Sequence, residues 1–114
     1  MLEMVKIAAK ALDDKKAVDI KVIKIGDLTV LADYFVICNG TSTTQIKSLA
    51  DEVEFKMEEA GYKISHREGK SAGNWILLDY HDIMVHIYNK EMREFYDLER
   101  FWRDGEFLEL ADLI

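Results

Sequence analysis

The sequence contains no proline and only one cysteine among its 114 residues. A single cysteine allows no disulfide within the chain, and this usage fits a reducing compartment such as the cytoplasm. Glycine is also scarce, and no Pro-rich or Gly/Ser-rich tract separates one part of the chain from another. We therefore expect one domain over residues 1–114, with a single hydrophobic core.

Signals for membranes and secretion are absent as well. No apolar run is long enough to span a bilayer. The first six residues lack the basic and apolar regions of a secretory signal. We expect a cytoplasmic protein that makes no contact with a membrane.

Basic residues are fewer than acidic ones. Lys and Arg number 15 against 22 Asp and Glu, which gives a net charge of -7. Because binding to a phosphate backbone depends on a basic stripe, we expect no direct, sequence-specific contact with nucleic acid. A basic protein partner is favoured instead, since opposite charge speeds encounter and selects among partners.

Hydrophobic patterning predicts helices that alternate with strands. Residues 2–15 have an amphipathic helical pattern, and a capping box of Ser42 and Gln45 starts a helix that ends at Gly61. The other expected elements are strands at 20–25, 34–38 and 62–67, a loop at 68–73, two strands within 73–88, a helix at 89–101 and a short helix at 107–113. This order predicts an α/β fold, with a mixed sheet of about five strands flanked by helices.

The segment from residue 73 to 88 has the most unusual composition. It consists of two short apolar strands that meet at a polar corner, residues 80–82. Side chains alternate along a strand, so Trp75, Leu77 and Asp79 share one face. Aromatic side chains dominate protein-binding hot spots, which makes this face a candidate contact patch. The alternative is that a helix covers Trp75.

Residues that could support catalysis lack the companions they need. Asp79 and Asp82 are the best paired carboxylates, but magnesium chemistry requires a further oxygen ligand, and turn formation explains both. The histidines and Cys38 show no spacing typical of zinc, and Cys38 lies in an apolar strand where an inert thiol is expected. Ser42–Thr44, at a helix start, could bind an anion, although capping explains these residues too. We expect no metal, no cofactor and no catalytic residue.

Three segments carry a resemblance to a known family. They are Ala32–Ile37 with Gly40, Ser42 and Gln45; Trp75 with Leu78–Tyr80, Asp82 and Val85–Ile87; and Arg93, Phe95–Tyr96, Leu98–Glu99 and Trp102. Each is weak alone, but the three in this order and at these separations are specific. The chain resembles the ribosomal silencing factor family, also called Iojap-like proteins, over nearly its whole length. One departure is His81, which stands where the family usually has glycine.

The resemblance implies a protein that is not an enzyme, with a nucleotidyltransferase-like fold that lacks the catalytic residues. Family members bind the large ribosomal subunit through ribosomal protein L-fourteen, a basic protein. They sterically block joining of the small subunit and so lower translation when nutrients are scarce; homodimers are common. Two alternatives stay open: an assembly factor for the large subunit, and a divergent metal-dependent nucleotidyltransferase that uses Asp79 and Asp82.

On this basis a set of residues is expected to form or support the ribosome-facing surface. The set comprises Trp75, Leu77, Asp79, Tyr80, Asp82, His86 and Glu99. The aromatic side chains would fill pockets in the partner, and the carboxylates would select its lysines and arginines. For His86, a satisfied core histidine is the alternative.

Overall fold

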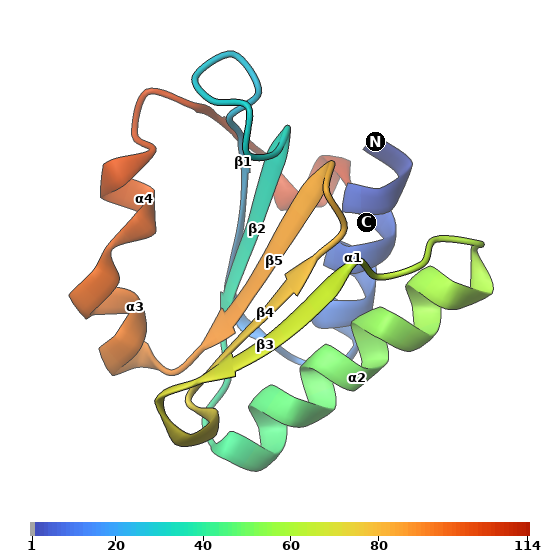
Figure 1. Cartoon of the computed structure of the whole chain (residues 1–114), viewed down its shortest axis with the longest axis vertical. Helices are drawn as coiled ribbons and strands as arrows, with labels where there is room; N and C mark the ends of the chain where they lie inside the picture. Colours follow the sequence, from blue (N-terminus) through green and yellow to red (C-terminus); the bar gives the residue numbers. More distant parts are fainter. Residues whose placement is uncertain (1) are drawn as a thin grey trace.

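The computed structural model describes residues 2–114 and shows a six-stranded sheet with helices on both faces (Figure 1). The elements are α1 (Leu2–Asp14), β1 (Val18–Lys24), β2 (Tyr34–Asn39), α2 (Thr43–Glu59), β3 (His66–Lys70), β4 (Trp75–Asp79), β5 (Ile83–Tyr88), α3 (Lys90–Tyr96), α4 (Leu98–Phe101) and β6 (Glu106–Leu108), with 3-10 turns at Ser71–Gly73 and Leu110–Asp112. The predicted α/β fold with a mixed sheet is confirmed. Within the described residues, no helix is long and apolar enough to cross a membrane.

The strands lie in the order β3-β4-β5-β2-β1-β6. Strand β2 pairs with β5 in parallel, and every other neighbouring pair is antiparallel. The strand predicted at 34–38 is β2, and its apolar run is buried between β5 and β1 within the sheet. The sixth strand was not predicted: β6 pairs with the otherwise free edge of β1, so the short helix expected at 107–113 is wrong for residues 107 and 108.

Helices α1 and α2 lie against one face of the sheet and enclose the larger core (Figure 1). The apolar side chains along one side of each helix are buried there, including Leu12 in α1 and Val53 in α2. The start of α2 follows the prediction, because the Ser42 hydroxyl accepts a hydrogen bond from the Gln45 N–H at 3.1 Å. Its end also follows the prediction, since Gly61 adopts a φ of +90° that favours glycine.

Strand β3 begins later than the sequence suggests. Residues 62–65 are a connection, and the strand at His66–Lys70 extends through residues that were expected to form a loop. Tyr62 and Ile64 pack against the larger core, so their apolar pattern reflects burial rather than strand pairing. The ladder with β4 continues to the pair Lys70 and Trp75, which brings β3 alongside the whole of β4.

The helix predicted at 89–101 is two helices. Asn89 caps α3, because its side-chain oxygen accepts a hydrogen bond from the Met92 N–H at 2.8 Å. Asp97 then takes a left-handed conformation with a φ of 40°, ends α3 and starts α4. The change of direction at Asp97 alters which aromatic side chains face the sheet.

Candidate functional site on the open face of the sheet

The face of the sheet opposite α1 and α2 is covered only in part, by α3 and α4, and it carries most of the predicted site residues. Strand pairing arranges this face in rows centred on β4. Starting beside α3, the rows are Lys70, Trp75 and Tyr88; then Glu68, Leu77 and His86; then His66, Asp79 and Met84. The predicted alternation along β4 is confirmed, because Ile76 and Leu78 lie in the core on the other face.

Trp75 is covered, which answers the alternative left open by the sequence. Its side chain is 7% exposed, and the ring of Tyr96 in α3 lies over it with ring centroids 4.6 Å apart. The indole N–H donates a hydrogen bond to Nδ1 of His86 at 3.2 Å. Trp75 therefore underlies the face instead of projecting from it.

His86 is a buried, neutral histidine. Burial, and secondly the positive charge of Lys70, lower the pKa of its imidazole to about 3. Because Nδ1 accepts the bond from Trp75, the ring proton resides on Nε2. Within residues 2–114, Nε2 has no hydrogen-bond partner, so His86 is a core histidine that is satisfied on one side only.

Asp79 shapes the corner between β4 and β5. Its carboxylate oxygen accepts a hydrogen bond from the backbone N–H of His81 at 2.8 Å, which makes Asp79 a turn-forming residue. His81 takes a φ of +68°, the conformation that glycine would adopt freely, so the corner keeps this geometry despite the histidine. The side chain of Asp82 is exposed beside it.

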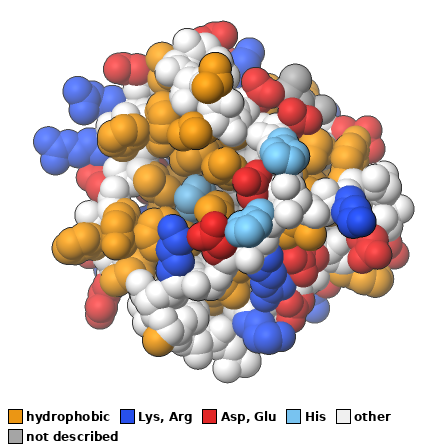
Figure 2. Space-filling view, viewed as in Figure 1, with side chains coloured by type: hydrophobic (Ala, Val, Ile, Leu, Met, Phe, Trp, Pro, Cys, Tyr) orange, Lys and Arg blue, Asp and Glu red, His pale blue; other side chains and the backbone are white. Residues whose placement is uncertain are grey.

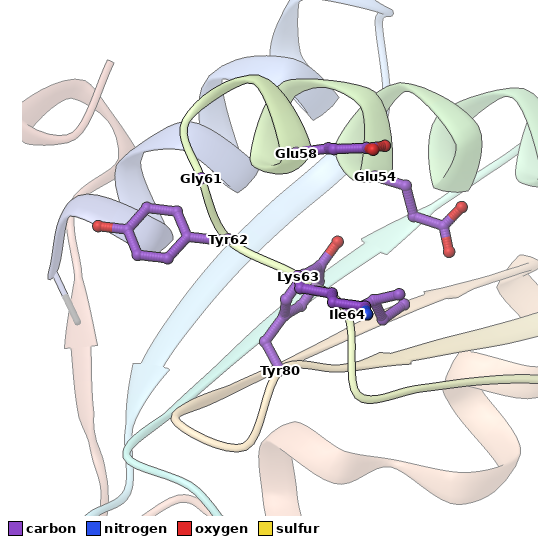
Figure 3. Close-up of a pocket in the computed structure, with 7 residues that line it drawn as sticks. All are labelled: Glu54, Glu58, Gly61, Tyr62, Lys63, Ile64 and Tyr80. Atoms are coloured by element: carbon purple, nitrogen blue, oxygen red, sulfur yellow. The ribbon is translucent and has the colours of Figure 1, made fainter.

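Tyr80 points to the opposite face from Trp75, Leu77 and Asp79. It is buried in the larger core, and it lines a pocket beside α2 (Figure 3). The structure therefore brings Trp75, Leu77, Asp79 and His86 together, but it places the side chain of Tyr80 on the other side of the sheet.

Glu99 accepts a hydrogen bond from Arg93, a residue that is not among the predicted site residues. Arg93 is 6% exposed, and its Nε donates to the Glu99 carboxylate at 2.8 Å. Its Nη1 donates to the backbone oxygen of Asp19 at 2.7 Å and to the side-chain oxygen of Asn39 at 3.0 Å. Arg93 thus ties α3 and α4 to β1 and β2. In the sequence, the one sign of this role is that Arg93 lies among aromatic and acidic residues.

Exposed aromatic side chains border the open face. Phe95 is 77% exposed and Phe101 is 73% exposed, with Tyr96 also exposed between them. On one continuous helix, Phe95 would share a stripe with Leu98 and Trp102, but the break at Asp97 separates it from them. Figure 2 shows hydrophobic side chains gathered over the region of α3 and α4, giving way to histidine and acidic side chains near the middle.

Reactive chemistry is sparse in this part of the molecule. Among residues 2–114, no group of three or more His, Cys, Asp or Glu could hold a metal ion. Cys38 is fully buried, and burial raises the pKa of its thiol to about 12, which keeps it protonated and unreactive. What the open face offers is apolar area and aromatic side chains, which are features of a protein-binding surface, together with carboxylates that favour a basic partner.

Comparison with known proteins identifies the relatives of this chain. A family model described as "Ribosomal silencing factor during starvation" matches residues 1–113. The ribosomal silencing factor of Bacillus subtilis is 39% identical over 110 residues, which cover 96% of this chain and 91% of that protein. A mouse protein named "Mitochondrial assembly of ribosomal large subunit protein 1" is 34% identical, over 80% of this chain and 41% of its own length.

A solved structure shares the fold. A crystal structure of a Chromobacterium violaceum protein superposes with a TM-score of 0.85 at 36% identity, and covers 94% of this chain and 88% of that one. The α/β fold is therefore one that relatives share. The further expectation of a nucleotidyltransferase-like fold stays a prediction.

Proposed function

The chain belongs to the ribosomal silencing factor family, and we propose that it binds the large ribosomal subunit through ribosomal protein L-fourteen. Bound there, it sterically blocks joining of the small subunit and lowers translation under nutrient limitation. The site of action is the cytoplasm, and the protein works by occupying a surface rather than by catalysis.

This proposal rests on one observation: the open sheet face carries an apolar side chain with carboxylates beside it. Leu77, at the centre of β4, and Asp79, at its end, are half-buried, and Asp82 is exposed at the adjoining corner. An apolar side chain with carboxylates beside it suits a basic partner, because the apolar contact gives affinity while the carboxylates select lysines and arginines. The net charge of -7 acts in the same direction over a longer range.

The remaining predicted residues support this face from within. Trp75 and His86 are joined by a hydrogen bond beneath it, and Tyr80 anchors the corner from the other side of the sheet. Glu99 acts through Arg93, which holds α3 and α4 in place. We propose that Leu77, Asp79 and Asp82 make the direct contacts with L-fourteen.

Silencing and subunit assembly are separable by one experiment. The name of the mouse relative favours an assembly role as the second candidate. We expect that the protein, added to purified mature subunits before sedimentation through a sucrose gradient, reduces the joined ribosome peak and stays with the large subunit. Unchanged joining, despite co-sedimentation with the large subunit, would favour assembly and overturn silencing.

We also propose that the protein forms a homodimer through the exposed aromatic side chains of α3 and α4. Phe95 and Phe101 expose apolar rings that a second copy would cover. The expected result is that Phe95→Ser shifts sedimentation equilibrium toward monomer, while Phe55→Ser, which removes an exposed ring from α2, leaves it unchanged. Equal association states for both variants and the parent protein would contradict this interface.

A further inference from the structure

The corner between β4 and β5 contains a strained residue. The N–H of Asp82 donates to the backbone oxygen of Tyr80 at 2.8 Å, which closes a three-residue turn with His81 at its centre. With a φ of +68° at His81, this is the rarer form of such a turn, and it is strained for every residue except glycine. Side chains held in strained conformations cluster at binding and active sites.

The surrounding structure holds this strain in place. The carboxylate of Asp79 accepts a hydrogen bond from the His81 N–H at 2.8 Å. The backbone oxygen of Asp82 accepts two more, from the N–H groups of Asp33 at 2.8 Å and Tyr34 at 3.2 Å. These bonds attach the corner to the loop that connects β1 to β2, so the two parts have a fixed relative position.

A cleft of about 420 Å³ lies between the corner and this loop. Figure 1 shows the loop rising beyond the end of the sheet at which β2 and β5 begin. Both parts contribute side chains to the cleft: His81 and Asp82 from the corner, and Thr29, Leu31 and Asp33 from the loop. The strained histidine is therefore one wall of a concave site.

The cleft has negative charge without a cation of its own. No lysine or arginine occurs among residues 25–33 or 79–83. Within residues 2–114, the carboxylates of Asp33 and Asp82 make no ion pair and no hydrogen bond. That of Asp33 lies over Gly26, where an added Cβ would be 2.7 Å from its Oδ1. Two free carboxylates beside one cleft suit a basic side chain.

The loop beside the cleft also exposes apolar side chains. Val30 is fully exposed, and Leu28 and Leu31 are exposed on either side of it. Three apolar side chains on one short loop form a patch of the kind that protein partners cover. The patch adjoins the cleft that Asp82 lines, so it continues the open sheet face beyond the corner.

We propose that the loop at residues 26–33 and the corner form a second docking element for the basic partner of the open sheet face, and that the cleft takes one lysine or arginine side chain of that partner. This inference rests on the proposed function. The cation lies beside the carboxylates of Asp33 and Asp82, and a neutral His81 ring accepts one hydrogen bond from it. The apolar side chains of the loop pack against the partner next to that contact.

His81→Gly separates binding from folding. Glycine relieves the strained φ, so we expect this variant to unfold at a higher urea concentration than the parent protein. It should nevertheless bind purified L-fourteen about fivefold more weakly, because the cleft loses one wall and one acceptor. Asp33→Asn, which removes one charge at nearly constant volume, should weaken binding by about the same factor. Urea denaturation and calorimetric titration measure the two effects.

Lys16→Gly is the matched control. Lys16 is exposed at the other end of β1 and also has a positive φ, of 63°. Its replacement should raise the urea midpoint in the same way and leave the affinity for L-fourteen unchanged.

Three results would overturn the proposal. If the parent protein binds L-fourteen and both His81→Gly and Asp33→Asn bind it equally tightly, the second docking element is wrong while the proposed function stands. If His81→Gly unfolds at the same or a lower urea concentration than the parent, the histidine is not held against strain for binding. If the parent protein does not bind L-fourteen, the proposed function fails and this inference fails with it.

Discussion

Replacing Arg93 with methionine is expected to lower the free energy of unfolding by about 3 kcal/mol. Methionine keeps much of the side-chain volume but removes every donor. The carboxylate of Glu99, the side-chain oxygen of Asn39 and the backbone oxygen of Asp19 would all lose their hydrogen bonds. Breaking a buried ion pair from one side costs more than removing both partners, because the remaining groups stay unpaired. Urea denaturation followed by circular dichroism measures the loss.

Arg100→Met is the matched control, since Arg100 is exposed on α4 and its side chain makes no hydrogen bond or ion pair within residues 2–114. Its effect should stay within about 0.5 kcal/mol. If the two methionine variants unfold at the same urea concentration, Arg93 is not the residue that ties α3 and α4 to the sheet.

The double substitution Leu77→Ser with Asp79→Asn should weaken binding to L-fourteen about 100-fold, because it removes one central apolar contact and one charge. The asparagine keeps a side-chain oxygen that can accept the hydrogen bond from the His81 N–H, so the corner retains its turn. The negative charge is lost without loss of the geometry. Calorimetric titration of purified L-fourteen measures the change.

Phe55→Ser controls for the loss of any exposed apolar side chain. Phe55 is 55% exposed on α2, which lies on the other face of the sheet. We expect this variant to bind L-fourteen like the parent protein. Parental affinity in the double variant, or an equal loss in Phe55→Ser, would show that the contact lies elsewhere on the molecule.

The central strands were predictable because their signal is local. The two-residue period of β4 places Trp75, Leu77 and Asp79 on one face, and the structure confirms this. The cover over Trp75 was not predictable, since it depends on a ring in α3 that reaches back across the sheet. Local periodicity shows which side chains share a face, but it does not show what covers that face.

The C-terminal third was predicted less well, for a backbone reason. A continuous helical pattern runs through residues 89–101, but Asp97 adopts a left-handed conformation and divides it. Beyond the break, Glu99 accepts a hydrogen bond from Arg93, and Arg93 also donates to groups on β1 and β2 that are distant in sequence. No pattern within the segment contains those distant contacts.

Tyr80 shows how a set of residues chosen by resemblance can be divided by geometry. Alternation along β4 already assigned Tyr80 to the face of Ile76 and Leu78, away from Trp75. The resemblance nevertheless grouped it with Trp75 as part of one surface. In the structure it belongs to the larger core and to the pocket beside α2, so its side chain is not part of the open face.

Hydrogen–deuterium exchange of this protein, with and without L-fourteen, tests most directly whether the open sheet face is the binding surface. We predict slower exchange in the complex at the amides of residues 80–82 and of α3 and α4, which border that face. The amides of α1 and α2 should exchange at the same rate in both states. Protection confined to α1 and α2, with none at the corner, would contradict binding through this face.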